Sequence, residues 1–443
     1  MSYSIGLVSL GCPKNQVDAE IMLAELVENG CEIVDFYDGA EVVIINTCGF
    51  IDSAKQEAIE NILEVADLKG RGIVKKIIVT GCLSQLHKEE IKKEIPEVDA
   101  VLGIGANASI FEHIKSIVEN NVEVITFPPR ENLPLNGTRL LTTPEYWAYL
   151  RIAEGCSNNC SYCLIPSIRG PFRSRPMEEL VEEAKDLAQK GVKELILIAQ
   201  DTTSYGYDIY GKLILPELLD ALSEIEGIQW IRLMYCYPDF VTDELIEKIK
   251  TNKKILHYID LPIQHSDDRI LTAMNRRLSG EELKALIEKM RNEIPDIVIR
   301  TTLITGFPGE DEEAFENLAT FVNELEFDRL GCFTFSPQEG TEAYDMDEQV
   351  DNETAAHRAE IIMRDQYEIM LEKNQNQIGR KLEVLVEGFD GYTDTYFGRS
   401  YMDAPEIDNK VYFSSPDAFD EGDFVAVEII GVSEYDLLGK SIE

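Results

Sequence analysis

Three cysteines at the spacing C-x3-C-x2-C limit what this chain can fold into more than any other feature. Cys156, Cys160 and Cys163 lie in one short loop, and soft thiolate ligands select zinc, copper(I) or iron–sulfur clusters. A structural zinc site normally has four protein ligands, and no fourth cysteine follows in this loop. Three ligands suit a 4Fe–4S cluster with one iron left open for a group that is not protein. Zinc, or simple burial of the cysteines in a core, stay open as alternatives.

Composition narrows the class of protein. The 443 residues are enough for two to four domains. No run approaches 18 apolar residues and the first residues are not basic, so neither a membrane span nor a secretory signal is expected. Nine cysteines without such a signal indicate reduced thiols in the cytoplasm that act as ligands. The net charge of −41 would repel phosphate backbones and attract a basic partner, unless it only reflects a generally acidic proteome.

The first 130 residues read as repeated strand–loop–helix units. Continuous apolar runs such as 42–46 and 77–80 alternate with helical patterns, which predicts a parallel sheet covered on both faces. In three units a cysteine follows the strand: Cys12, Cys48 and Cys82. Because parallel strands end along one edge of a sheet, these cysteines are expected to converge into a second three-thiolate site. Chance placement of the three is the alternative.

From Trp147 onward six further strand–helix units predict an incomplete barrel of the TIM type, with its site at the strand ends. The loop of Cys156 follows the first of these strands, on the expected active face. Polar residues follow the other strands, among them Gln200, His265 and the Thr305-Gly306 pair. His265 could be a general base or a hydrogen-bonded structural histidine.

A long helical pattern at 353–377 leads to a C-terminal segment of short strands, which predicts a small antiparallel β-barrel. Residues 379–443 contain five Lys and Arg against fifteen Asp and Glu. The overall expectation is an α/β chain with domains at 1–130, 146–377 and 378–443 and a linker at 131–145.

The motifs taken together resemble the methylthiotransferase family of radical S-adenosylmethionine (SAM) enzymes. The resemblance covers essentially the whole chain, from the N-terminal cluster domain through the radical SAM core to the terminal TRAM domain. Its local matches are the segments 9–15, 46–51, 160–166, 169–170, 173–175 and 261–265.

The resemblance implies two 4Fe–4S clusters and SAM. One cluster would be held by Cys156, Cys160 and Cys163 and would bind SAM at its open iron. An auxiliary cluster would be held by Cys12, Cys48 and Cys82 and would supply sulfur. The expected SAM contacts are Tyr162, Gln200, Thr305 and Gly306. Arg173 and Arg175 could bind a carboxylate of SAM or substrate, or could form surface salt bridges.

Two branches of the family differ in substrate. One modifies a tRNA adenosine, and the RimO type modifies the β-carbon of an aspartate in the twelfth protein of the small ribosomal subunit. Segments 9–15 and 198–206 look like the RimO-type versions of their loops. A TRAM domain that holds RNA should be basic, whereas this one carries −10. We therefore expect a basic ribosomal protein as partner, no tRNA, no membrane and an external electron donor. A non-catalytic iron–sulfur carrier is a further alternative.

Overall fold

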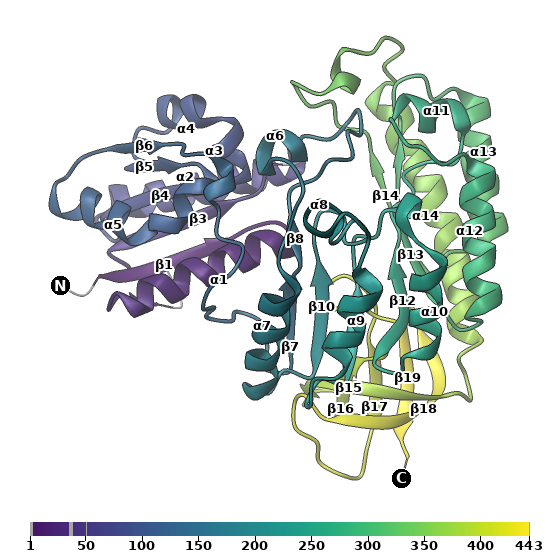
Figure 1. Cartoon of the computed structure of the whole chain (residues 1–443). Coiled ribbons are helices and arrows are strands. Elements are labelled where there is room, and N and C mark those ends of the chain that lie inside the picture. The colour runs from purple at the N-terminus through teal and green to yellow at the C-terminus, as the bar shows by residue number, and fades with distance from the viewer. Residues whose placement is uncertain (1–2, 35–38, 50, 443) are drawn as a thin grey trace.

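The computed structural model describes residues 3–34, 39–49 and 51–442, and Phe50 of the matched segment 46–51 lies outside this set. Figure 1 shows three parts. An N-terminal α/β domain lies to one side of a central partial barrel, and a small C-terminal barrel lies against one end of the latter. Within the described residues, no helix is long and apolar enough to cross a membrane.

The N-terminal domain is a six-stranded, fully parallel sheet in the order β2-β1-β3-β4-β5-β6. Its strands are β1 (Ser4–Ser9), β2 (Glu32–Ile33), β3 (Val42–Thr47), β4 (Lys76–Gly81), β5 (Ala100–Leu102) and β6 (Val124–Thr126). Its helices are α1 (Pro13–Glu28), α2 (Asp52–Gly70), α3 (Cys82–Leu86), α4 (Lys88–Glu94) and α5 (Ile110–Glu119). Helices α1 and α5 cover one face, and α2 and α4 cover the other, as the apolar runs of the strands predict.

The central sheet is also parallel and six-stranded, in the order β14-β13-β12-β11-β10-β7, with its ends unpaired so that the barrel stays open. Its strands are β7 (Trp147–Arg151), β10 (Glu194–Ile198), β11 (Trp230–Leu233), β12 (Ile255–Asp260), β13 (Val298–Thr305) and β14 (Arg329–Thr334). A two-stranded ribbon of β8 (Ala153–Glu154) and β9 (Arg173–Ser174) flanks it.

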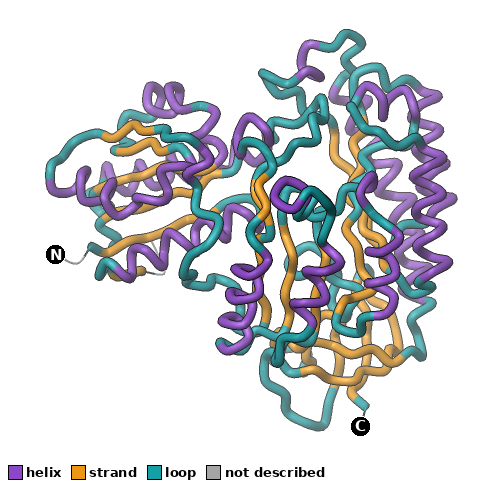
Figure 2. Tube along the Cα trace, viewed as in Figure 1, coloured by secondary structure: helices purple, strands orange, loops and turns teal. Residues whose placement is uncertain are grey.

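Helices pack on the outer face of the central sheet, and Figure 2 shows them as a layer in front of and beside the orange strands. The larger ones are α7 (Met177–Gln189), α9 (Leu215–Ser223), α10 (Asp243–Thr251), α12 (Gly280–Glu293), α13 (Glu312–Leu325) and α14 (Asn352–Gln375). Three shorter ones are α6 (Ile165–Arg169), α8 (Tyr207–Tyr210) and α11 (Asp268–Ala273). Short 3-10 turns lie at Ile104–Ser109, Arg130–Asn132, Pro238–Phe240 and Glu342–Asp345.

The C-terminal barrel closes in the order β15-β16-β17-β19-β18. Its strands are β15 (Lys381–Asp390), β16 (Thr395–Arg399), β17 (Val411–Ser414), β18 (Phe424–Ser433) and β19 (Asp436–Ser441). It differs from the antiparallel barrel expected from sequence in one pairing, because β17 and β19 run parallel.

This C-terminal barrel packs on the inner face of the central sheet. Side chains alternate along each strand, so that Trp147 and Tyr149 of β7 and Trp230 of β11 join the core of the C-terminal barrel, while Leu150 and Leu233 join the helices outside. The central strands are buried on both faces for this reason, and the open end of the partial barrel that remains is the one where the loops after the strands lie.

Candidate functional site

The three N-terminal cysteines converge as the parallel topology predicts. Cys12 caps the start of α1, Cys48 follows β3, and Cys82 follows β4. A Cβ atom on Gly11 would lie 2.6 Å from the Cβ of Cys48, and one on Gly49 would lie 2.7 Å from the Cα of Leu83. The loops approach one another so closely only because these positions are glycine.

Asn15 ties the same three loops together. Its amide group donates to the carbonyl oxygens of Leu10 and Thr47, each at 2.9 Å. Its Oδ1 atom lies 3.7 Å from Cys82 Sγ. Asn15 is buried in the first turn of α1, so the position of all three cysteine loops depends on the last residue of the matched segment 9–15, to which the sequence alone assigns no role.

The second trio lies in the loop between β8 and α6. The backbone amide of Asn158 donates to Cys156 Sγ at 3.4 Å, and the amide of Ile165 donates to Cys163 Sγ at 3.5 Å. The side chain of Asn158 donates in turn to Asp201 at 2.6 Å, in the loop after β10. Backbone amides directed at sulfur stabilise thiolates, which are the form that binds iron.

At each site at least one buried thiol is a poor acid in the absence of a metal. Burial raises the pKa of Cys82 to about 12 and the pKa of Cys156 to about 11. Within the described residues, no three His, Cys, Asp or Glu side chains are grouped so as to hold one ion. A single ion requires its ligands within about 4 Å of one another, whereas thiolates on a four-iron cluster each bind a different iron. Two sets of three thiols on converging loops fit such clusters.

The two cysteine sites are neighbours. Cys82 packs against Leu164 and Ile168, and Leu164 directly follows Cys163. Figure 1 shows α3, which begins at Cys82, beside α6, which follows the second cysteine loop. The N-terminal domain therefore presents its cysteines to the active face of the partial barrel.

A buried network of charges holds this junction. Arg169 Nη2 donates to Cys82 Sγ at 3.5 Å, and its Nη1 donates to Asp18 at 2.7 Å and to Glu154 at 3.2 Å. Arg151 also bonds Asp18 and Glu154. Glu154 lies two residues before Cys156, so Arg169 joins a thiol of one site to the carboxylate beside the other. Burial alone would raise the pKa of Glu154, but attraction to the two arginines lowers it overall.

The sequence motifs missed most of this network. Its acidic member on α1, Asp18, is separated from Arg151 by 133 positions and from Arg169 by 151. The one usable signal was the placement of Asp18 and Glu20 within the apolar pattern of α1, since buried carboxylates need partners.

The four expected SAM contacts have different surroundings. Gln200 Nε2 donates to Glu154 at 2.5 Å beside the cysteine loop, and its buried Oε1 has no partner among the described residues. Tyr162 packs edge-on against Phe307. The Thr305 hydroxyl donates to the carbonyl of Ala355 in α14. The Gly306 amide donates to Glu310, which Arg358 of α14 also bonds.

Gln200 is therefore the expected contact whose surroundings best suit a ligand. Thr305 and Gly306 are engaged in docking α14, and their contact with SAM stays a prediction. His265 is likewise engaged on both ring nitrogens: Nδ1 accepts from the amide of Asp267 at 3.0 Å, and Nε2 lies 3.2 Å from Glu310. This geometry favours the structural interpretation of His265 over a general base.

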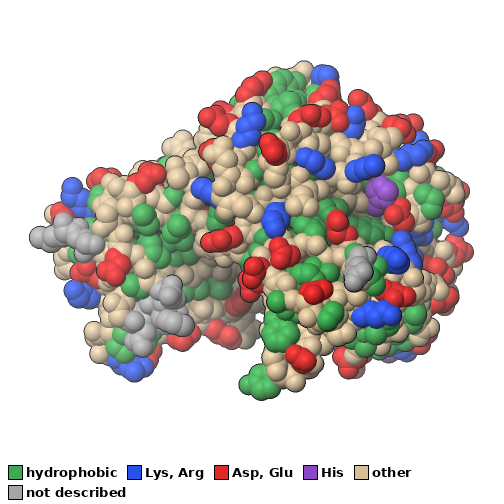
Figure 3. Space-filling model, turned by 90° about the horizontal axis from the view of Figure 1, so that it is seen from below, with side chains coloured by type: hydrophobic (Ala, Val, Ile, Leu, Met, Phe, Trp, Pro, Cys, Tyr) green, Lys and Arg blue, Asp and Glu red, His purple; other side chains and the backbone are tan. Residues whose placement is uncertain are grey.

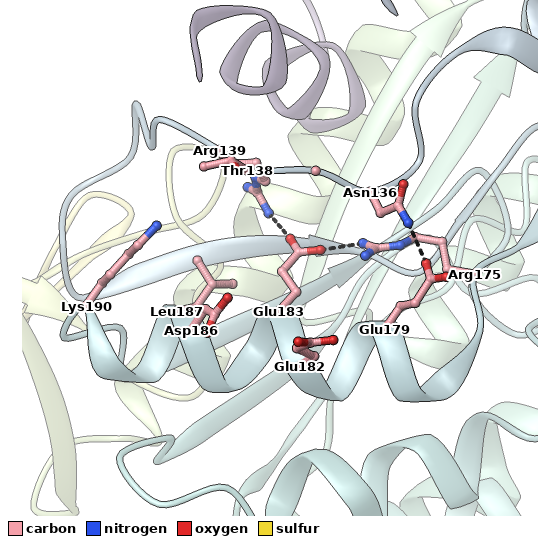
Figure 4. A pocket seen from close by; sticks show the side chains of 11 residues that line it. Asn136, Thr138, Arg139, Arg175, Glu179, Glu182, Glu183, Asp186, Leu187 and Lys190 are labelled. Carbon is pink, nitrogen blue, oxygen red and sulfur yellow. Dashed lines mark hydrogen bonds and ion pairs between the residues drawn. The ribbon is translucent and has the colours of Figure 1, made fainter. Parts of the chain in front are cut away.

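The two arginines considered as carboxylate binders differ. Arg175 is buried and forms an ion pair with Glu183 at 2.6 Å. Glu183 also forms an ion pair with Arg139 at 2.7 Å. Figure 4 shows this bridge at the back of a groove of about 420 Å³ between α7 and residues 136–139. None of the six cysteines lines the groove, so Arg175 acts in the fold. Arg173 bonds the carbonyl of Glu131, and its Nε and Nη2 atoms are buried without a partner among the described residues.

The remaining cysteines lie apart from both sites. Cys31 belongs to the core of the N-terminal domain, Cys236 is buried in the central core, and Cys332 packs beside that core. These three cysteines therefore serve in packing.

Comparison with known families follows the same three parts. The model of the radical SAM superfamily matches residues 150–322, that of the uncharacterized protein family UPF0004 matches 4–103, and that of the TRAM domain matches 378–442. Among solved structures, a radical S-adenosylmethionine methyltransferase, TsrM from Kitasatospora setae, has a TM-score of 0.59 at 15% identity, covering 78% of this chain and 77% of its own. That likeness shows the fold. Fold and cysteine loops together define a radical SAM enzyme with a TRAM domain.

Full-length relatives narrow the class. The chain is 50% identical over 438 residues to the ribosomal protein uS12 methylthiotransferase RimO of Thermoanaerobacter sp. (strain X514), and 51% identical to that of Caldanaerobacter subterraneus subsp. tengcongensis, each match covering 99% of both chains. The chain belongs to the RimO-type family of radical SAM methylthiotransferases.

Proposed function

We propose that this protein transfers a methylthio group to the β-carbon of an aspartate in ribosomal protein uS12. The observation that carries the proposal is the contact of the two three-cysteine sites, in which Cys82 packs on the residue after Cys163 and Arg169 spans both. A reaction that joins a carbon activated at one site to sulfur from the other requires such proximity. Family membership favours uS12 over the tRNA adenosine.

In this proposal Cys156, Cys160 and Cys163 hold the 4Fe–4S cluster that binds SAM, and Cys12, Cys48 and Cys82 hold the auxiliary one. The bound groups supply hydrogen abstraction and the transferred sulfur. The chain itself orients the first loop through Asp201 and Asn158, and fixes the second site through Asn15. Gln200 and Arg173 have buried polar atoms without partners and are the proposed contacts for the polar groups of SAM.

Charge supports a basic protein as substrate. On the face drawn in Figure 3, acidic side chains are spread widely with basic ones between them. The C-terminal barrel carries −10 and uses its core to cover the central sheet, so neither its charge nor its placement suits a phosphate backbone. An external electron donor and a cytoplasmic location complete the proposal, because the clusters need a reducing supply and reduced thiols.

The experiment is an anaerobic reaction of the reconstituted protein with SAM, dithionite and purified uS12. Mass spectrometry should find one methylthio group on one aspartate of uS12, and the protein should hold roughly eight irons. Modification of tRNA instead of uS12 would overturn the choice of substrate. Absence of 5′-deoxyadenosine would favour an iron–sulfur carrier.

Cysteine variants test the division of labour. Cys156→Ala should abolish SAM cleavage, whereas Cys48→Ala should leave SAM cleavage and stop sulfur transfer. Cys31→Ala is the matched control, because Cys31 is buried in the N-terminal domain away from both sites. If Cys48→Ala and Cys156→Ala gave the same defect, the assignment of the two sites would be wrong.

A further inference from the structure

Lys14 places a buried amino group at the junction of the two domains without a carboxylate partner among the described residues. Its side chain is 6% exposed, and within the described residues its one polar contact is the ring of Tyr235, whose centroid lies 3.3 Å from Nζ. An ammonium group has three hydrogen-bond donors and a strong preference for an anion when buried. The face of an aromatic ring stabilises part of the positive charge, but it does not accept conventional hydrogen bonds from the N–H groups.

Its position is between the two proposed reaction partners. Lys14 lies in the first turn of α1, two residues after Cys12, on the side of the sulfur-supplying site. Tyr235 lies in the loop that follows β11 of the partial barrel, on its active face. The lysine therefore crosses from the N-terminal domain to the strand ends where the barrel would hold SAM.

The tyrosine is held in place at some cost to the backbone. Its φ angle is +60°, which is rare for a bulky residue. Its amide donates to Asp260 at 2.9 Å, and its carbonyl accepts from Thr202 at 3.0 Å. The surface against which Lys14 rests is thus fixed from two neighbouring strands.

Nearby carboxylates are already committed to other cations. Lys14 is within electrostatic range of the Cys12 thiol and of two carboxylates, Glu154 and Asp260. Cys12 is a proposed cluster ligand, Glu154 pairs with Arg151 and Arg169, and Asp260 pairs with Arg300 at 3.0 Å. The buried arginines at the same junction each have a carboxylate partner. Lys14, by contrast, is buried and forms no ion pair with a carboxylate among the described residues.

We propose that Lys14 binds the carboxylate of the substrate aspartate. This inference rests on the proposed function and names the group by which the site recognises its substrate. The β-carbon that reacts is bonded directly to the carboxylate carbon. Binding of the carboxylate to Lys14 therefore holds the reacting carbon beside the Cys12 site, facing the loop that follows β11. It also selects aspartate over asparagine, because an amide cannot neutralise a buried ammonium.

The test compares two forms of uS12 on two forms of the holoenzyme. The dissociation constant of uS12, and of uS12 with its modified aspartate changed to asparagine, is measured anaerobically with SAM present. The unaltered protein, which has Lys14, should bind the aspartate form of uS12 about 10- to 100-fold more tightly than the asparagine form. Lys14→Met, which keeps the chain length and removes the charge, should bind both forms equally and weakly. Lys14→Arg, which keeps the charge, should retain a preference for aspartate.

The matched control is Lys93→Met, because Lys93 is an exposed lysine of the same domain that pairs with Glu94 on the surface. It should keep the full preference. The inference would be overturned by a Lys14→Met protein that still prefers the aspartate form. It would also be overturned if Lys14→Met lost affinity for both forms to the same extent and shifted the reduction potential of the auxiliary cluster. Neither outcome would affect the proposal that the unaltered enzyme modifies uS12. Failure of the unaltered enzyme to modify uS12 would overturn both.

Discussion

At the scale of single residues, Gly11 decides whether the first two cysteine loops can meet. Its φ is +90°, and an added Cβ would lie 2.6 Å from the Cβ of Cys48 and 2.9 Å from its Sγ. Gly11→Ala should therefore displace Cys48 and reduce the iron content of the reconstituted protein from roughly eight to roughly four per chain. Iron analysis and the electron paramagnetic resonance of the remaining cluster measure the effect.

Gly30→Ala separates the clash from the backbone strain. Gly30 has a similar φ of +81°, and nothing lies within 4 Å of the position of its Cβ. Both alanines cost about 1 kcal/mol of backbone strain, but Gly30→Ala should keep all its iron. Equal iron loss in the two variants would mean that strain, and not contact with Cys48, is responsible.

Arg169 is the residue whose loss should harm the junction most. Arg169→Met would leave Asp18 and Glu154 buried with less compensation, since Arg169 Nη1 bonds both. Removing one partner of a buried ion pair costs about 3–5 kcal/mol. The free energy of unfolding of the cluster-free protein, from urea titration, measures this. The exposed pair of Arg71 and Asp67 gives the control, because Arg71→Met should change stability by less than about 1 kcal/mol. A similarly small loss for Arg169→Met would contradict the role of the network.

Residue-scale features divide into those the sequence predicts and those it does not. The two cysteine trios follow from spacing and from strand ends. Lys14, Asn15 and Arg169 could not be assigned, because each depends on a partner that only the docking of two domains supplies. Arg175 shows the reverse case: its type suits a carboxylate ligand, but the carboxylate it meets is Glu183 of its own chain.

At the scale of elements, long apolar strands were predictable and short ones were not. The strands β3 and β4 appear where the continuous apolar runs 42–46 and 77–80 predict them, within one residue at each end. The three-residue strands β5 and β6 carry too little pattern to be recognised. Helix α1 begins at Pro13, because proline is favoured in the first turn of a helix.

What covers the two faces of the central strands could not be predicted from the sequence. An apolar run indicates that both faces are covered, but it does not say by what. Here helices cover one face and a β-barrel from the far end of the chain covers the other. The alternation of Trp147 and Tyr149 with Ala148 and Leu150 has this origin.

Strand β10 carries the link between the central sheet and the C-terminal barrel. Glu194 is buried between Arg232 of β11, at 2.7 Å, and Arg399 of β16, also at 2.7 Å. Burial alone would raise the pKa of Glu194, but the attraction of the two arginines outweighs it, so the pKa lies below its usual value. A carboxylate with a lowered pKa stabilises the fold above its unfolded pKa of about 4.3, and that contribution is lost as the pH falls through the folded value.

Glu194→Gln should therefore destabilise the protein by about 3–5 kcal/mol at pH 7, and the difference from the unaltered protein should shrink below pH 4. Urea titrations from pH 7 to pH 3.5 at low protein concentration measure both effects. Glu316→Gln on the exposed side of α13 is the control and should show neither. A pH-independent difference would mean that the packing of the side chain, and not its charge, holds the barrel.

At the scale of the whole molecule, charge should govern encounter with the substrate. A net charge of −41 creates a field that speeds association with a basic protein and is screened by salt. The association rate constant for uS12 should fall roughly tenfold or more between 50 and 500 mM potassium chloride. Stopped-flow fluorescence measures it. A rate independent of salt would contradict a charge-guided encounter.

The order of the parts along the chain has a consequence for how the molecule is made. Trp147, Tyr149 and Trp230 are covered by residues 381–441, which are synthesised after the central strands. During synthesis the aromatic face of the central sheet therefore stays uncovered until these strands are made, and exposed apolar surface promotes aggregation. A chain truncated before these strands would be prone to aggregation and would be bound by chaperones and proteases, even though it contained every cysteine.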